Sequence, residues 1–137
     1  MNIIDMKLMR YINLLDRISR VKTRKCFVYN NIIVFAVPRE MMSQAIGPGA
    51  SNIMRIQEQL GKRVKIVLEP RGIEDAQNFV REIVSPVRFK SLELKEGMLV
   101  LNAGMTSKAA LIGRNKKRLE ELSEIIMNNF GLNLKII

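Results

Sequence analysis

Residues 42–57, MSQAIGPGASNIMRIQ, and residues 108–123, KAALIGRNKKRLEELS, decide the fold of this chain. In each stretch an isoleucine precedes a glycine, and the two glycines, Gly47 and Gly113, are separated by nearly half the length of the chain. Glycine at such a point ends a helix and lets the backbone turn sharply. Both stretches therefore predict a short helix, a glycine turn and a second helix.

Outward from the first turn, the apolar pattern predicts the order helix, strand, strand, helix, helix, strand. Asn30-Asn31 indicates a hairpin between the first two strands, because asparagine tolerates positive φ. Ser51 is the expected N-cap of the helix after the turn, and Gly61 is its expected C-terminal glycine. The predicted helices cover 4–19, 39–46 and 52–60, and the predicted strands cover 26–29, 32–37 and 62–69.

The same order returns in the second half of the chain. Thr106 is the expected cap of the short helix that ends at Ile112. The alternation of the strand over 87–94 slips between Phe89 and Leu92, which predicts a β-bulge or a strand twist. The remaining elements are a helix over 73–84, a longer helix that reaches Phe130, and strands over 98–102 and 132–137.

Duplication of one unit explains this repetition. The closing strands begin at Lys62 and Leu132, and the separation of these two residues along the chain is close to that of the two glycines. Matching offsets are the signature of an internal repeat. We therefore predict an α+β chain of two domains, 1–71 and 72–137, each with a three-stranded sheet packed against three helices.

Composition narrows the class of partner. Apolar residues make up 47% of the 137 residues, as in a folded globular chain, and no apolar run approaches the length of a membrane-spanning helix. We expect a soluble, cytoplasmic protein with no membrane partner. The net charge of +10 favours a polyanion, above all nucleic acid. An acidic membrane surface, an acidic protein, or a basic composition without a binding role are the alternatives.

The absent residue types argue against catalysis. There is no histidine, and the single cysteine, Cys26, is expected to be a core thiol, so imidazole and thiolate metal sites are excluded. No phosphate-binding loop, nucleophile elbow or carboxylate cluster replaces them. We predict no enzyme activity, no cofactor, no metal and no small-molecule substrate. Tryptophan is absent and aromatics are 5%, which disfavours a binding surface of stacked aromatic platforms.

A short helix, a glycine turn and a second helix against a three-stranded sheet resemble a KH domain, and the helix-first order resembles its type II form. The family signature is an apolar residue followed by GxxG. Here it reads Ile46-Gly47-Pro48-Gly49-Ala50 and Ile112-Gly113-Arg114-Asn115-Lys116, so both copies lack the fourth glycine. Two such domains in so short a chain resemble the archaeal NusA-like proteins. That resemblance implies a role in transcription termination or antitermination, with single-stranded RNA and RNA polymerase as partners.

The loops suit phosphate for physical reasons. Glycine lets a sugar-phosphate chain approach the backbone closely, and the amides and dipole at the next helix start favour anions. KH domains clamp about four nucleotides with this loop. The predicted RNA-binding residues are Ile46, Gly47, Pro48, Gly49, Ala50, Lys62, Arg63, Lys65, Arg88, Ile112, Gly113, Arg114, Asn115, Lys116, Lys117 and Arg118, with Ile53, Ile56 and Leu119 in the groove or the core beneath it.

The second loop is the stronger candidate. An ordinary helix end also carries a glycine, and GPGA contains no cation and loses a donor at Pro48. In GRNKKR, cations gather where the helix dipole favours anions, which indicates that a ligand supplies the negative charge. Single-stranded DNA is an alternative ligand. The alternative function is a protein-interaction adaptor that contacts RNA polymerase or a ribosomal component.

Overall fold

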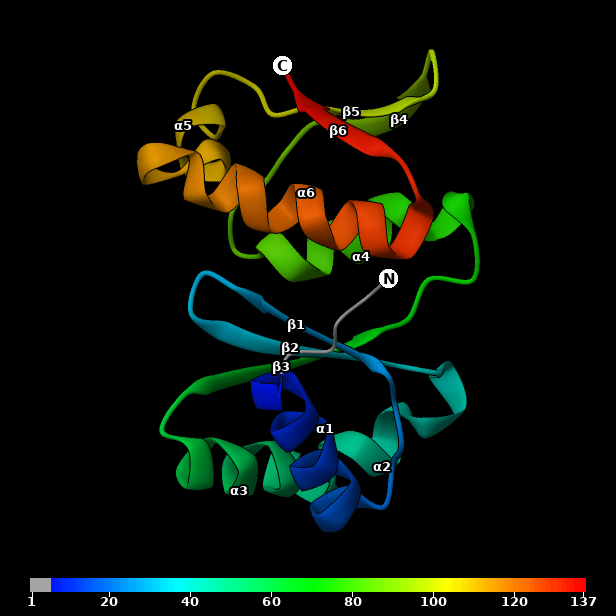
Figure 1. Cartoon of the computed structure of the whole chain (residues 1–137), viewed down its shortest axis with the longest axis vertical. Helices are drawn as coiled ribbons and strands as arrows, with labels where there is room; N and C mark the ends of the chain where they lie inside the picture. Colours follow the sequence, from blue (N-terminus) through cyan, green and yellow to red (C-terminus); the bar gives the residue numbers. More distant parts are fainter. Residues whose placement is uncertain (1–5) are drawn as a thin grey trace. The chain divides into compact units, whose positions relative to one another are not determined.

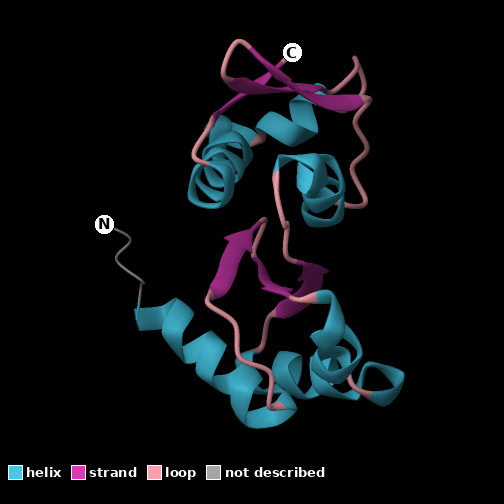
Figure 2. Ribbon diagram, turned by 90° about the vertical axis from the view of Figure 1, so that its right-hand side faces the viewer, coloured by secondary structure: helices cyan, strands magenta, loops and turns pink. Residues whose placement is uncertain are grey.

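The computed structural model describes residues 6–137, and the chain divides into two compact units. The first unit ends at Glu69 and the second runs from Pro70 to Ile137 (Figure 1). The sequence placed the boundary slightly later, between 71 and 72. In each unit the helices lie on one side of a small sheet (Figure 2). The chain is thus α+β with two three-stranded sheets, an arrangement compatible with a KH-like fold.

The first unit has the predicted order of elements. Its sheet order is β1-β2-β3, in which β1 is antiparallel to β2 and β3 is parallel to β2. The predicted helix start at residue 4 lies outside the described residues. The elements are α1 (Met6–Ser19), β1 (Lys25–Tyr29), β2 (Ile32–Val37), α2 (Met42–Ile46), α3 (Ser51–Leu60) and β3 (Arg63–Leu68).

Two features of this unit follow directly from local sequence. Asn30 and Asn31 have φ of 54° and 61°, the left-handed pair that a tight hairpin needs, as predicted. Apolar residues spaced along the helices and β2 meet in one core, where Leu15, Phe35 and Ile56 are completely buried. Burial of this kind supplies most of the stabilisation of a small domain.

The second unit repeats the arrangement. Its sheet order is β4-β5-β6, again with an antiparallel pair followed by a parallel one. Leu101, Leu111 and Leu122 are completely buried, and the rings of Phe79 and Phe130 meet edge to face with centroids 6.0 Å apart. The elements are α4 (Ala76–Val84), β4 (Ser91–Lys95), β5 (Met98–Asn102), α5 (Lys108–Ile112), α6 (Lys117–Phe130) and β6 (Asn133–Ile136).

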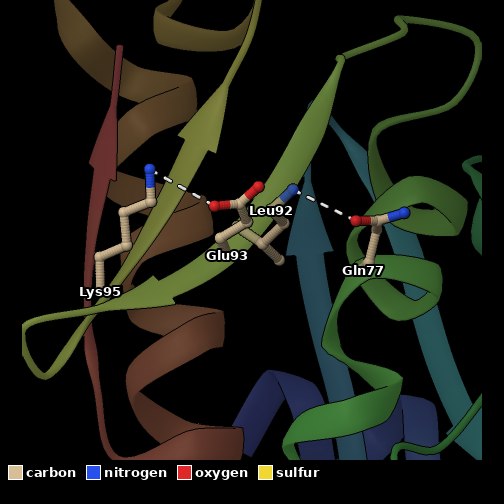
Figure 3. A network of polar contacts seen from close by, with 4 residues as sticks. All are labelled: Gln77, Leu92, Glu93 and Lys95. Carbon is tan, nitrogen blue, oxygen red and sulfur yellow. Dashed lines mark hydrogen bonds and ion pairs between the residues drawn. The ribbon is translucent and has the colours of Figure 1, made fainter.

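A side chain of α4 fastens the edge strand β4 (Figure 3). The backbone N–H of Leu92 donates to Oε1 of Gln77 at 3.3 Å, so this outward-facing donor is occupied. An occupied donor reduces the tendency of an edge strand to pair with another chain. On the same strand Lys95 Nζ lies 3.4 Å from Glu93 Oε2, but both side chains are more than half exposed, so the ion pair adds little stability.

The structure corrects three local predictions. The strand predicted over 87–94 begins only at Ser91, and its pairing with β5 is continuous, so the predicted bulge is wrong. The apparent slip arose because 87–90 are not strand residues. Ser51 and Thr106 are not N-caps: Ala50 and Ser107 hold those positions, with no side-chain capping hydrogen bond. The chain conformation before each helix, and not a hydroxyl, sets where these helices start.

The two offsets seen in the sequence have a single structural cause. From the first strand of each sheet to the start of the helix after the loop, corresponding elements are displaced along the chain by the same amount as the two loop glycines. Thus β1 and β4 begin at Lys25 and Ser91, and α3 and α6 begin at Ser51 and Lys117. Helix α6 has 14 residues and α3 has 10. This extra helical turn produces the larger offset of the closing strands.

Candidate nucleic-acid interface

The two glycine loops have the same backbone conformation. The leading glycines are extended with positive φ, and the third and fourth loop residues are left-handed. Corresponding angles nearly coincide. The (φ, ψ) pairs are Gly47 (78°, 163°) and Gly113 (76°, 170°), Gly49 (59°, 28°) and Asn115 (56°, 29°), and Ala50 (62°, 27°) and Lys116 (60°, 21°).

Backbone hydrogen bonds close both turns in the same way. The N–H of Ala50 donates to the carbonyl of Gly47 at 3.1 Å, and the N–H of Lys116 donates to that of Gly113 at 3.1 Å. The second loop position differs, because Pro48 has no N–H whereas Arg114 has one. The second loop therefore carries one more backbone donor for an anion.

Only glycine fits the first position of each loop. Its φ and ψ lie in a region essentially restricted to glycine. A Cβ on Gly47 would lie 2.8 Å from Oγ of Ser51, and one on Gly113 would lie 2.5 Å from Cγ and 3.0 Å from the backbone N of Arg118. These glycines are therefore required by the geometry of the turn.

The cations of the second loop have two different roles. Arg118, half-buried, packs over Gly113, and its Nη1 lies 3.1 Å from Oε1 of Glu121. The guanidinium is engaged within the protein and braces the turn, and the predicted role of Arg118 as an RNA ligand stays a prediction. In contrast, Arg114, Lys116 and Lys117 are exposed, as is Asn115, and no carboxylate among residues 6–137 lies within ion-pair distance of these three cations.

The first loop has the shape without the charge. Pro48 and Gly49 are exposed, Ile46 and Ala50 are half-buried, and the loop contains no cation. Asn52 braces it by donating from Nδ2 to the carbonyl of Gln44 at 2.9 Å, which ties the start of α3 to α2. This loop can admit a backbone closely but offers an anion little attraction.

Helix α3 separates two of the three predicted strand cations from this loop. Lys62 and Arg63 follow the C-terminal end of α3, and a helix of 10 residues spans about 15 Å. Both side chains are exposed, whereas Lys65 is half-buried within β3 and has interactions of its own. Lys62 and Arg63, which are near the loop in sequence, are therefore separated from it by the length of α3.

The apolar groove residues fall into two groups. Ile56 is completely buried and belongs to the core, and Ile53 packs against that core while half-buried. Ile112 and Leu119, on either side of the second loop, are also half-buried. Only the half-buried residues present apolar surface to a ligand.

Arg88 lies at the loop end of the second unit. It is exposed and sits in the irregular segment before β4. The next-but-one residue, Lys90, donates its backbone N–H to the carbonyl of Asn102 at 2.7 Å, where β5 ends and the chain leads into α5. Lys90 is not among the predicted RNA-binding residues, although Lys90 and Arg24 occupy corresponding positions of the repeat.

Other site types find little support in the described chain. Residues 6–137 contain no group of three or more His, Cys, Asp or Glu side chains arranged to hold a metal ion. Within the same residues no helix is long and apolar enough to cross a bilayer. Burial raises the pKa of the Cys26 thiol to about 12, which keeps it protonated and a poor nucleophile.

Comparison with known proteins gives distant relatives. No family model matches the chain. It is 24% identical over 127 residues to the "Probable transcription termination protein NusA" of Halococcus morrhuae, covering 90% of this chain and 89% of that protein. It is also 24% identical over 119 residues to the protein of the same name from Methanocaldococcus jannaschii, covering 84% of this chain and 63% of that protein.

A solved structure shares the fold over nearly the whole length. The "Crystal structure of APE1850" superimposes with a TM-score of 0.64 at 26% sequence identity, and the match covers 98% of this chain and 100% of that one. The sequence matches support weak homology to archaeal NusA-like proteins.

Proposed function

We propose that this chain is a non-catalytic, cytoplasmic single-stranded RNA-binding protein, built from two tandem type II KH domains. Its role would be that of a NusA-like factor in transcription termination or antitermination, as the names of its relatives suggest. The observation that carries the proposal is the second loop. A glycine turn there ends at the start of a 14-residue helix and presents three exposed cations without ion-pair partners among the described residues.

Phosphate oxygens are the groups that this loop suits. The N–H groups of Lys116 and Lys117 donate to the carbonyls of Gly113 and Arg114, so the backbone attraction for an anion at this point comes from the dipole of α6. Arg114, Lys116 and Lys117 add charge at the same point, which is unfavourable for the helix unless an anion is bound. RNA phosphates supply that anion, and the half-buried Ile112 and Leu119 provide apolar surface for bases.

The first loop contributes less in this proposal. Its backbone follows the same path, but Pro48 removes a donor and no loop residue is charged. A phosphate there would rely on the dipole of α3 alone. We expect the second loop to supply most of the affinity and the first to guide the strand sterically.

A protein-interaction adaptor is the second candidate. An uncharged, exposed Pro48-Gly49 turn is compatible with contact to a protein surface, and transcription termination named in the relatives makes RNA polymerase the partner to consider. This function predicts binding that is insensitive to charge at the second loop.

The test is a fluorescence-anisotropy titration of a random single-stranded RNA pool over a salt series. Substituting Gly47 or Gly113 would deform the turn, so the informative variant is Arg114→Glu/Lys117→Glu, on exposed side chains. If two phosphate contacts are lost, the slope of log affinity against log salt concentration becomes shallower by about 1.4. The affinity near 0.1 M salt then falls by roughly 25-fold.

The matched control is Arg10→Glu/Lys135→Glu, which makes the same change in net charge on exposed residues of α1 and β6. The proposal requires the loop variant to bind much more weakly than this control. Equal losses in both variants would mean that charge acts diffusely, and the adaptor function would then lead.

A further inference from the structure

A second repeated feature lies outside the loops. We name residues 20–24 and 86–90 the pre-strand segments, because each leads directly into the first strand of its sheet. In each segment two exposed cations at corresponding positions alternate with more buried residues. They are Lys22 and Arg24 in the first unit, and Arg88 and Lys90 in the second, again with the same displacement along the chain as the two loop glycines. The first segment has a third exposed cation, Arg20, where the second has Pro86.

The first pre-strand segment is firmly anchored. Val21 and Thr23 are buried, at 1% and 9% exposure. Thr23 Oγ1 donates to the carbonyl of Ala36 at 2.6 Å and accepts from the N–H of Lys25 at 3.1 Å. With alternate residues fixed inside, Lys22 and Arg24 point the same way, about 6.6 Å apart in an extended chain.

The second pre-strand segment is anchored at the equivalent place. Lys90 donates its N–H to the carbonyl of Asn102, which corresponds to Ala36 in the repeat. Phe89 lies under the guanidinium of Arg81, 5.7 Å from the ring centroid, a cation–π contact that holds the segment against α4. The Lys90 stem passes Gly104 closely, because a Cβ there would lie 3.3 Å from Cε.

Each pre-strand segment lies at the loop end of its own unit. The carbonyls of Ala36 and Asn102 are near the ends of β2 and β5, from which the chain enters the short helix before the loop. In the first unit, Gln44 of α2 also donates from Nε2 to the carbonyl of Ser19 at 3.0 Å, next to the pre-strand segment. Loop and segment are therefore joined through one short helix.

Charge distinguishes the segments from the loops. The first loop has no cation and the second has several, whereas both pre-strand segments carry two at the same positions and no acidic residue. Cations that served only to keep the surface solvated would not need to recur at the same positions of the repeat. We infer that the pre-strand segments are a second pair of phosphate-binding sites, which contact single-stranded RNA beyond the nucleotides held at the glycine loops. This inference rests on the proposed function.

The test compares two RNA lengths. The probes are fluorescent oligouridines, one of about four nucleotides, the span of a KH loop, and one about three times longer. The variants are Lys22→Glu/Arg24→Glu and Arg88→Glu/Lys90→Glu, with Arg10→Glu/Lys135→Glu as the control of equal charge. The glutamine versions of the pre-strand variants replace any that fail to fold, as judged by circular dichroism.

We expect the pre-strand variants to weaken binding of the long probe by roughly 25-fold near 0.1 M salt, and to leave the short probe at the level of the control. If they match the control on both probes while Arg114→Glu/Lys117→Glu weakens binding, the inference is overturned and the proposed function stands. If the loop variant is also without effect, the proposed function fails and the inference fails with it.

Discussion

Replacing Lys116 by glycine should make the protein more stable and a weaker RNA binder. Lys116 is left-handed at φ 60°, where an L side chain costs about 1–2 kcal/mol. Glycine removes that cost, but its greater backbone freedom stabilises the unfolded chain by about 0.4–1 kcal/mol. The net expected gain in the free energy of unfolding is about 0.5–1 kcal/mol.

The same substitution removes one exposed cation from the second loop. If Lys116 neutralises one phosphate, the salt slope falls by about 0.7, which is roughly fivefold in affinity near 0.1 M salt. Ala50 occupies the equivalent position of the first loop at φ 62° and has no charge. Ala50→Gly should therefore give a similar gain in stability with no loss of affinity.

Urea unfolding followed by far-ultraviolet circular dichroism measures the first effect, since the chain lacks tryptophan, and RNA anisotropy over a salt series measures the second. Lys116→Asn is the matched control, because asparagine tolerates the left-handed region and also removes the charge. A less stable Lys116→Gly protein, or one with unchanged affinity, would refute the reasoning from strain and from charge respectively.

Two further predictions concern stability. Gly113→Ala should lower the free energy of unfolding by more than about 2 kcal/mol, because the backbone is essentially glycine-only and the new Cβ would press on Arg118; an unchanged urea midpoint would contradict this. The raised pKa of Cys26 predicts stability that is complete below pH 9 and is lost toward pH 12, by about 1.4 kcal/mol per pH unit, since the unfolded thiol ionises first. Comparing urea midpoints of wild type and Cys26→Ala between pH 7 and pH 10.5 checks it: the variant should lack this part of the decline.

Local sequence was sufficient for the elements and their order. Asn30-Asn31, Gly61 and the two loop glycines act through their own backbone preferences, so the turns that they predict form where expected. Apolar periodicity likewise predicted helices such as 73–84, whose apolar residues Ala76, Phe79, Val80 and Ile83 are buried in α4. These local patterns predict structure reliably because each involves residues that are close together along the chain.

Long-range contacts decided the remaining features. Sequence spacing gave no sign that Asn102 receives the hydrogen bond that pins Lys90. Proximity along the chain did not show that a helix of 10 residues separates Lys62 from the loop. Which cations face a ligand depends on how the chain is pinned between neighbours.

By itself, the sequence determined a duplicated α+β unit, two glycine turns at corresponding places and a strongly basic surface, because these depend on residue type and on short-range periodicity. The tertiary structure alone decided which cations gather at the loop end of each unit. The sequence gives only the separation of two residues along the chain. Their distance in space is set by the register of the strands and by the length of α3.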